Sequence, residues 1–308
     1  MQMLFGALLR DWWERYLLRG NPEYAREAWR RLEREVLPIL GDKPPRKITP
    51  PMILAILRKI EARGAPVAAR KVKSHISQAM RYGIACGVVV SDPTRDLTYA
   101  LTPHHSRPRA AILDHAAIGR LMASIERFRP RRRALSLKLA ALTFVRPGEL
   151  ATASWADISF EAALWRIPAE RMKMKRPHQV PLSRQAVEAF RELHAITGRR
   201  SPWCFPRRGD PTRPEGPGCL THSLRCMGYD RATMTGHGFR AMAATTLSEM
   251  GWASEAIERQ LAHVDHNQVR AAYQRSELVE ERRKMLQEWA DWLDLRCAQT
   301  ILREYGRA

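Results

Sequence analysis

The sequence predicts a mainly α-helical chain of two domains, an all-helical first domain and an α+β second domain with one small antiparallel sheet. Three observations lead to this prediction. A chain of 308 residues, 45% of them hydrophobic, is long enough to bury two cores of ordinary size. Apolar residues recur every three or four positions through the first hundred residues, which indicates helices. Between residues 155 and 182, short segments alternate apolar and polar residues, which indicates strands.

The first domain is predicted over residues 1–101. Its opening helix has an apolar residue every fourth position, and the turn Gly20-Asn21-Pro22 ends it. Three further helices show the same kind of spacing, and the last of them runs from Pro66 to Cys86. The apolar faces of the four helices consist of Leu4, Leu8, Trp12 and Tyr16; Trp29, Leu32 and Val36; Ile53, Ile56 and Ile60; and Val67, Ile76, Met80 and Ile84.

The helix over residues 66–86 also carries basic and polar residues away from its apolar side. Such a face can rest on a nucleic acid duplex, and a solvated charged face has the same composition. The candidate DNA-binding residues on it are Arg70, Lys71, Lys73, Ser74, Gln78 and Arg81.

Residues 102–110 are predicted to form a basic linker, because they contain two prolines and no apolar periodicity. The second domain is predicted over residues 111–308. Its expected elements are helices over 113–126 and 131–144, strands over 155–160, 164–168 and 179–182, a helix near 184–196, a loop rich in Pro, Gly and Arg over 198–218, and helices from there to the end.

The net charge favours nucleic acid as the partner. The chain has 52 Lys and Arg against 32 Asp and Glu, a net charge of +20, and an isoelectric point near 10.6. Basic proteins bind polyanions because binding releases counterions from the phosphates. Acidic residues interrupt the basic ones along the chain instead of leaving one basic stripe opposite an apolar face, which argues against a membrane surface.

Several other classes of protein are disfavoured. No run of 18 apolar residues exists, and the opening segment lacks the pattern of a secretion signal. The five cysteines are scattered and form no CxxC pair, which favours reduced thiols over disulfides or structural zinc. No glycine precedes a lysine, and no GxGxxG follows an apolar strand, so nucleotide-binding motifs are missing. We therefore expect no metal and no cofactor, and we interpret His263, Asp265 and His266 as loop residues rather than metal ligands.

Four local patterns in the second domain carry candidate chemistry. Arg146 stands at a Pro-Gly break after an apolar helix, His237 and Arg240 lie three residues apart, His263 ends an amphipathic helix, and Tyr273 follows ten residues later. Singly, each pattern has an ordinary explanation: a salt bridge for the arginine, a helix cap for the histidine, core packing for the tyrosine. Together, in this order within so basic a chain, the four patterns carry more weight than any one of them alone.

In this order and spacing the second domain resembles the tyrosine recombinase, or phage integrase, family, and most of all its prophage and genomic-island integrases. The first domain resembles the helical, SAM-like core-site binding domain of the same family, through less specific motifs. Integrases of this subgroup carry a further N-terminal domain that binds arm sites, and the chain is expected to lack it. The matching segments are Arg146-Pro147-Gly148-Glu149-Leu150, residues 167–175, His237-Gly238-Phe239-Arg240, residues 257–263, Tyr273 and residues 280–284.

The resemblance implies a site-specific DNA recombinase that needs no metal. Tyr273 would attack a phosphodiester and form a 3′-phosphotyrosine, leaving a free 5′-hydroxyl. A phenol with a pKa near 10 is a weak nucleophile and a phosphodiester repels anions, so both need cations nearby. Arg146 and Arg240 would bind the non-bridging oxygens, His237 would exchange a proton, and His263 would donate a hydrogen bond to the phosphate.

The leaving 5′-oxygen needs a proton, which the family takes from a lysine of the β-hairpin. Lys173 lies eight residues before Pro181, the register usual in the family, and is favoured over Lys175, which would share its strand face. The other lysine, like Arg176, would contact backbone phosphates. Glu149 matches the acid that follows the first arginine and would support that arginine rather than transfer a proton.

The resemblance also implies the partners. They are double-stranded DNA with core attachment sites, three further copies of the chain in a synaptic tetramer, and accessory DNA-bending proteins. The expected role is integration or excision of a prophage or genomic island in the cytoplasm, with nucleoid association when DNA is bound. Two alternatives stay open, a non-catalytic DNA-binding regulator with the same fold and a type IB topoisomerase, which shares the phosphotyrosine chemistry.

The chain ends in a predicted amphipathic helix that carries Leu278, Met285, Trp289, Trp292 and Leu293. The sequence leaves two placements open for this helix. Either it packs on its own domain, or it docks on a neighbouring subunit, as the family resemblance suggests.

Overall fold

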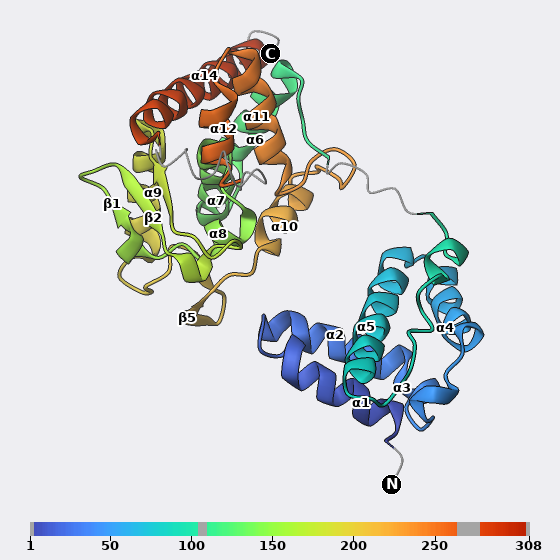
Figure 1. Cartoon of the computed structure of the whole chain (residues 1–308). Coiled ribbons are helices and arrows are strands. Elements are labelled where there is room, and N and C mark those ends of the chain that lie inside the picture. Colours follow the sequence, from blue (N-terminus) through green and yellow to red (C-terminus); the bar gives the residue numbers. More distant parts are fainter. Residues whose placement is uncertain (1–2, 104–109, 264–277, 306–308) are drawn as a thin grey trace. The chain divides into compact units, whose positions relative to one another are not determined.

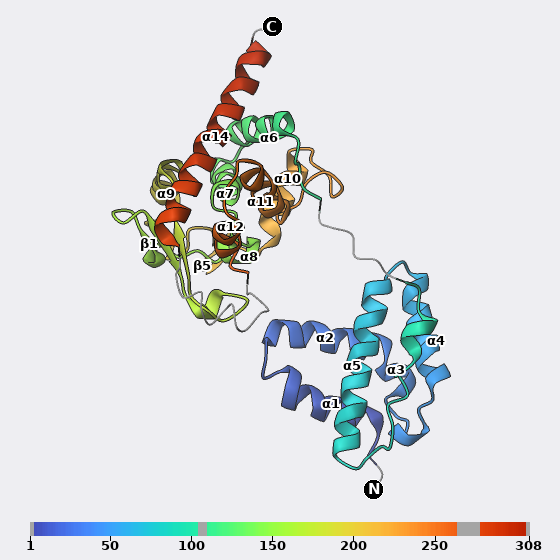
Figure 2. The ribbon, with the colours of Figure 1, turned by 45° about the horizontal axis from the view of Figure 1, so that its top comes forward.

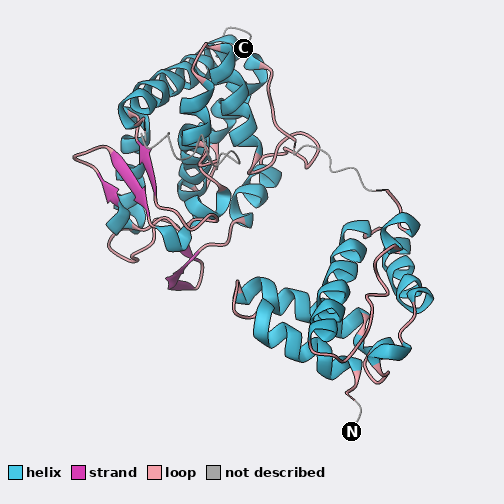
Figure 3. Cartoon of the chain, in the orientation of Figure 1, coloured by secondary structure: helices cyan, strands magenta, loops and turns pink. Residues whose placement is uncertain are grey.

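The computed structural model describes residues 3–103, 110–263 and 278–305, and it divides into two compact units, Met1–Arg107 and Pro108–Ala308 (Figure 1). Each unit buries a hydrophobic core of its own. The division falls within the segment 102–110 that was predicted as a linker. The predicted fold class is confirmed, because the described part of the first unit forms helices and the second adds a small antiparallel sheet (Figure 3).

The first unit packs its helices around Leu8, Trp12, Leu32 and Ile76, which are almost fully buried. The side chain of Asn21 caps one helix by accepting hydrogen bonds from two backbone N–H groups of its first turn. The helices are α1 (Phe5–Trp12), α2 (Pro22–Glu35), α3 (Leu37–Leu40), α4 (Pro50–Ala62) and α5 (Pro66–Ala85), with a π-helical turn at Trp13–Leu17 and 3₁₀ turns at Pro45–Lys47 and Leu97–Ala100.

The predicted apolar faces of the first unit are wrong at four positions, where the side chains are exposed. Leu4 precedes α1 and has extended backbone, so it does not share the helical face. Tyr16 lies in the π-helical turn, whose wider turn breaks the spacing of four residues. Val67 and Ile84 lie in the first and last turns of α5, outside the face formed by the buried residues of the helix.

The second unit surrounds its core with helices and has its sheet at one side, where the pink loops of Figure 3 join three magenta strands. The sheet is antiparallel in the order β1-β2-β3, with Trp165 opposite Val180. Trp165 is fully buried and meets Phe190 of α9 edge to face, with 5.9 Å between ring centroids. The strands are β1 (Ile158–Ser159), β2 (Leu164–Ile167) and β3 (His178–Pro181), and the helices are α6 (His115–Arg127), α7 (Arg131–Thr143), α8 (Pro147–Ala151), α9 (Arg184–Thr197), α10 (Gly218–Cys226), α11 (Gly238–Glu249), α12 (Ser254–Gln260) and α14 (Val279–Tyr305).

Two segments of the second unit differ from the prediction. Trp155–Asp157 forms a 3₁₀ turn instead of the start of a strand, because the Asp157 carboxylate accepts the backbone N–H of Ser154 and closes the turn. The loop predicted over 198–218 contains a second two-stranded sheet, β4 (Pro206–Arg207) with β5 (Asp210–Pro214). Gly209, at a φ of 84°, allows the tight turn between them.

The terminal helix α14 packs on its own unit and crosses α6, as Figure 2 shows. Met285, Trp289 and Leu293 are fully buried, and the indole N–H of Trp289 donates to the carbonyl of Ala141 at 2.9 Å. Gly119 of α6 lets the two helices approach, because a Cβ there would lie 2.6 Å from the carbonyl oxygen of Arg296. Leu278 precedes the helix instead of belonging to it. No helix within the described residues is long and apolar enough to cross a membrane.

Candidate active site

Arg146 stands at the start of α8, immediately after the end of α7. Helix α7 ends at Thr143, the next residue, Phe144, turns the chain with a left-handed φ of 37°, and Pro147 then opens α8. Glu149 is 3% exposed and accepts from the backbone N–H of Arg146 and from its Nη1, both at 2.9 Å. One carboxylate therefore fixes both the backbone turn and the direction of the guanidinium.

Arg240 lies in the first turn of α11 and is held by the ends of two other helices. It is 9% exposed and donates to the carbonyls of Phe144 at 2.9 Å and Leu261 at 2.7 Å. These oxygens end α7 and α12, and the carboxyl end of a helix carries partial negative charge. Burial and the charge of Arg146 lower the pKa of Arg240 to about 10, although Glu149 and Glu258 oppose the shift. Arg240 is therefore still a cation at neutral pH.

The end of α12 brings the two arginines and His263 together. Arg146 donates through Nη2 to the carbonyl of Ala262 at 3.1 Å, and Arg240 uses the carbonyl one residue earlier. His263 Nε2 lies 3.1 Å from Arg240 Nη2, while Nδ1 lies 2.6 Å from the carboxylate of Glu258. The imidazole is about half exposed, so this cluster of two guanidiniums and a histidine can be reached from solvent.

His237 lies one residue before α11 and three residues before Arg240. Thr235 fixes this turn, because its hydroxyl donates to the carbonyl of Ala110 at 3.2 Å and accepts the N–H of Gly238 at 3.0 Å. Gly236 packs against α8, where a Cβ would lie 3.4 Å from the ring of Pro147. The turn that carries His237 is thus packed against the helix that begins beside Arg146.

A buried polar network lies beneath the arginines, and the sequence analysis missed it. Gln260 and Arg282 are 0% exposed. The Gln260 amide donates to the carbonyl of Thr143 at 2.9 Å and accepts from Arg282 Nη2 at 2.8 Å and Nε at 3.1 Å. Arg282 also donates to the carbonyl of Gln179. The signal that could have revealed Arg282 is a charged residue on the apolar face of the last helix, one turn before Met285.

His178 of β3 belongs to the same network. Its Nε2 lies 3.2 Å from the carbonyl of Gln260. Burial, the charge of Arg282 and, less strongly, the charges of Arg146 and Arg240 lower the pKa of His178 to about 3, although the hydrogen bond to Gln260 opposes the shift. His178 is therefore neutral, and Nε2–H donates to the carbonyl.

The candidate lysines lie in the loop between β2 and β3, not on a strand. The shared strand face that the sequence suggested is therefore wrong. Lys173, Lys175 and Arg176 are exposed. Lys175 adopts a left-handed φ of 53° and donates to the carbonyl of Glu170 at 3.3 Å, whereas Lys173 bonds to no residue within the described ranges. Buried Met172 anchors the loop between them and β2.

The predicted nucleophile, Tyr273, lies outside the described residues, as do Asp265 and His266. The described chain stops at His263, beside Arg240, and begins again at Leu278. Within residues 3–103, 110–263 and 278–305, no cluster of His, Cys, Asp and Glu side chains is arranged to hold a metal ion.

The structure divides the candidate DNA-binding residues of α5 into two groups. Three of them bind loops of their own unit: Arg70 donates to the carbonyl of Thr102 at 2.7 Å, Lys73 donates to the hydroxyl of Thr98 at 2.6 Å, and Arg81 lies 3.6 Å from the carboxylate of Asp92. The other three are exposed on the helix, namely Lys71, Ser74 and Gln78.

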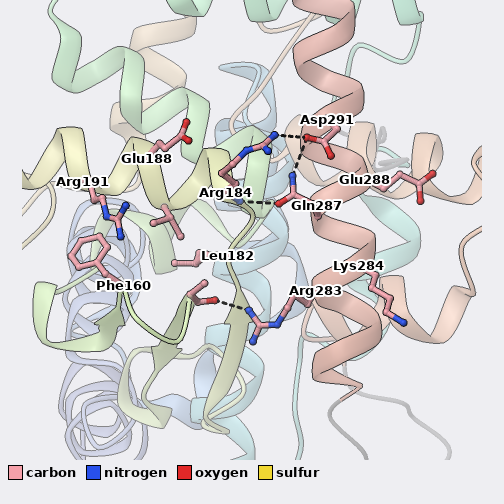
Figure 4. Close-up of a pocket in the computed structure, with 12 residues that line it drawn as sticks. Phe160, Leu182, Arg184, Glu188, Arg191, Arg283, Lys284, Gln287, Glu288 and Asp291 are labelled. Carbon is pink, nitrogen blue, oxygen red and sulfur yellow. Dashed lines mark hydrogen bonds and ion pairs between the residues drawn. The ribbon is translucent and has the colours of Figure 1, made fainter.

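A cavity of about 740 Å³ lies between α9 and α14 and contains none of the candidate catalytic residues (Figure 4). Figure 4 shows Arg184 directed at Asp291, with 3.2 Å between their charged atoms, and its backbone N–H bonded to Gln287. Arg191 instead lies over the ring of Phe160, with 5.9 Å from Cζ to the centroid. Basic and acidic side chains alternate at the rim, so this cavity does not gather positive charge as the end of α12 does.

Comparisons with known proteins match both units. The sequence pattern of the phage integrase family matches residues 111–278, and that of the phage integrase central domain matches residues 5–100. The integrase of Enterobacteria phage P4 is 36% identical over 307 residues, which cover 94% of this chain and 69% of the relative. Prophage integrase IntA of Escherichia coli is 33% identical over 291 residues, which cover 93% and 69%.

Solved structures agree in fold. A lambda integrase dimer bound to a COC′ core site superposes with a TM-score of 0.67 at 20% identity, over 89% of this chain and 96% of the other. A lambda integrase tetramer bound to a Holliday junction gives a TM-score of 0.68 at 20% identity, over 90% of this chain and 78% of the other.

Proposed function

Because the chain belongs to the phage integrase family and is a site-specific tyrosine recombinase, we propose that it cleaves and rejoins duplex DNA by attack of Tyr273 on a phosphate bound at the end of α12. The observation that carries this proposal is the convergence of Arg146 and Arg240 on adjacent carbonyls, 262 and 261, with His263 3.1 Å from Arg240. A phosphate bound there would meet two planar guanidiniums and an imidazole.

The two arginines contribute differently to binding a phosphate. Arg146 is paired with the Glu149 carboxylate, so part of its charge is already compensated. Arg240 is bonded to neutral carbonyls, which orient the guanidinium and leave its net charge in place. A guanidinium has five N–H donors, so each arginine can bond phosphate oxygens in addition to these anchors. Arg240 therefore supplies most of the stabilisation of the negative charge that grows in the transition state.

The proposed reaction has two balanced steps. In the first, the phenol oxygen of Tyr273 bonds to phosphorus, its proton passes to His237, and the bond from phosphorus to the 5′-oxygen breaks as Lys173 gives that oxygen a proton. In the second, the oxygen of a 5′-hydroxyl bonds to phosphorus as its proton passes to the neutral Lys173, and the bond from phosphorus to Tyr273 breaks as His237 returns a proton to the phenol oxygen. The arginines supply the positive charge, so cleavage should proceed in the presence of a metal chelator.

The relatives suggest what surrounds this chemistry. By analogy with the lambda integrase structures, the chain acts on core sites in duplex DNA as a tetramer. The family resemblance adds accessory DNA-bending proteins as further proposed partners. Its relatives are named as phage and prophage integrases, so the DNA is the end of a prophage or genomic island and the reaction is its integration or excision in the cytoplasm. We expect the exposed Lys71, Ser74, Gln78, Lys175 and Arg176 to contact backbone phosphates.

The test is a covalent adduct. Purified chain is mixed in EDTA with labelled duplex that spans the element's ends and carries a nick that traps the intermediate. The expected product is a protein–DNA band that resists SDS, and Tyr273→Phe abolishes it while still binding the DNA. Binding without an adduct would favour a DNA-binding regulator, and relaxation of supercoiled DNA without strand exchange would favour a topoisomerase.

A further inference from the structure

Two buried side chains link the chain on either side of residues 264–277. Gln260 is the last residue of α12, three residues before His263, and Arg282 lies in the first turn of α14. Both are 0% exposed, and two hydrogen bonds of 2.8 and 3.1 Å join Arg282 to the Gln260 side-chain oxygen. The end of α12 and the start of α14 are therefore fixed to each other.

Gln260 also connects this link to the arginine site. Its amide donates to the carbonyl of Thr143, and the carbonyl of the next residue, Phe144, accepts from Arg240. Its backbone carbonyl accepts from His178 of β3. A shift of Gln260 would therefore move the end of α7 and the end of α12, which together hold Arg240.

Arg282 extends the link to the sheet. Its guanidinium bonds the carbonyl of Gln179 in β3 as well as the Gln260 amide. Burying a guanidinium costs free energy of desolvation, and an apolar residue of similar volume often packs as well or better. The arginine instead contributes directional hydrogen bonds, because its planar fork holds α12, β3 and α14 in one relative orientation.

We propose that Arg282 is a positioning residue for DNA cleavage, which acts through Gln260 to fix the start of α14 against the end of α12. This inference rests on the proposed function, in which the nucleophile is carried between those two points. Fixing both ends of a short segment restricts where its residues can reach, and reactions between groups held in place are faster than those between mobile groups.

The experiment separates binding from cleavage in the full chain. Arg282→Met, Gln260→Met and the double variant are compared with the unsubstituted chain for DNA affinity and for the single-turnover rate of adduct formation at saturating protein. The matched control is Arg283→Met, because Arg283 is the next arginine of α14 and instead bonds the carbonyls of Ala162 and Ala163 near the cavity.

Each single variant should form adduct about 10- to 100-fold more slowly, while DNA affinity stays within about 3-fold and the control is unchanged. Because the two side chains act through one contact, the double variant should be no more than about 3-fold slower than the slower single variant. Losses that multiply would mean that the residues act independently, and the proposal would be wrong.

Arg282→Lys is measured beside Arg282→Met, because lysine keeps the charge without the fork and is less disruptive to folding. This variant too should lower the rate of adduct formation more than it lowers the affinity for DNA. If both Arg282 variants lose DNA affinity along with cleavage, the residue is merely structural and the proposal fails. If the unsubstituted chain forms no adduct, the proposed function fails and this inference fails with it. If the unsubstituted chain forms the adduct and Arg282→Met forms it as fast as Arg283→Met, only the inference fails.

Discussion

Lowering the pH should destabilise the second unit through His178. This imidazole is 6% exposed, donates to the carbonyl of Gln260, and lies near the positive charges of Arg282, Arg146 and Arg240. Protonation would place a further positive charge among them, and the charged imidazole would still be buried. The folded protein therefore excludes a proton that the unfolded chain accepts.

The sign and size follow from the two pKa values. The pKa of His178 is lowered from 6.5 to about 3, so its contribution to stability is complete above pH 6.5 and is lost as the pH falls from 6.5 towards 3. Each pH unit within this window is worth about 1.4 kcal/mol. Between pH 7 and pH 5 the loss is about 2 kcal/mol, and it reaches about 4 kcal/mol by pH 3.

The assay is urea unfolding of the full chain at pH 7 and pH 5, followed by hydrogen exchange of peptides from the second unit. His178→Gln cannot titrate, so the unsubstituted chain should lose about 2 kcal/mol more than this variant on acidification. The control is His222→Gln, which removes an exposed histidine and should lose as much as the unsubstituted chain. Equal losses for the unsubstituted chain and His178→Gln would refute the reasoning, because His178 would then titrate normally in the folded protein.

Three further predictions concern the site and its support. Arg240→Lys should slow adduct formation about 100-fold or more, because a single ammonium nitrogen cannot replace a fork whose two terminal nitrogens bond different helix ends and still face a phosphate. A rate within about 3-fold of the unsubstituted chain would contradict this. Lys173→Ala should slow cleavage of ordinary DNA but not of DNA with sulfur at the 5′-bridging position, because a thiolate leaves without a proton. The control Lys175→Ala should slow cleavage of neither substrate. A defect that persists with the sulfur substrate would show that Lys173 is not the acid. Gly119→Ala should lower the free energy of unfolding by about 1–3 kcal/mol, because its Cβ would lie 2.6 Å from the backbone oxygen of Arg296; an unchanged urea midpoint would mean that α6 and α14 separate without cost.

Local patterns predicted the helices of the second unit well. Asp114 and Ser183 cap α6 and α9 with their side chains, and both helices begin within two residues of the positions expected from the sequence. The alternating segment around Trp155 was misleading, because a carboxylate two residues later closes a 3₁₀ turn. The second sheet was missed because proline residues occupy both of its short strands, and proline normally argues against a strand.

The site could be predicted only in part. The family resemblance implied that Arg146, Arg240 and His263 share a site, and the structure brings their side chains to the end of α12. Gln260 and Arg282 both lie in segments that match the family, but they are 22 positions apart and nothing in the sequence pairs them, so only the fold shows that they touch. The role of Tyr273 stays a prediction, since that residue lies outside the described ranges.

The backbone anchors of Arg240 have a consequence for interpreting mutational scans. The oxygens that hold this guanidinium belong to the main chain of residues 144 and 261, so no side-chain substitution can delete them. A scan should therefore find both positions permissive among apolar residues of similar size, although they lie directly beside a proposed catalytic group. Tolerance to substitution would then be a poor guide to distance from the chemistry in this protein.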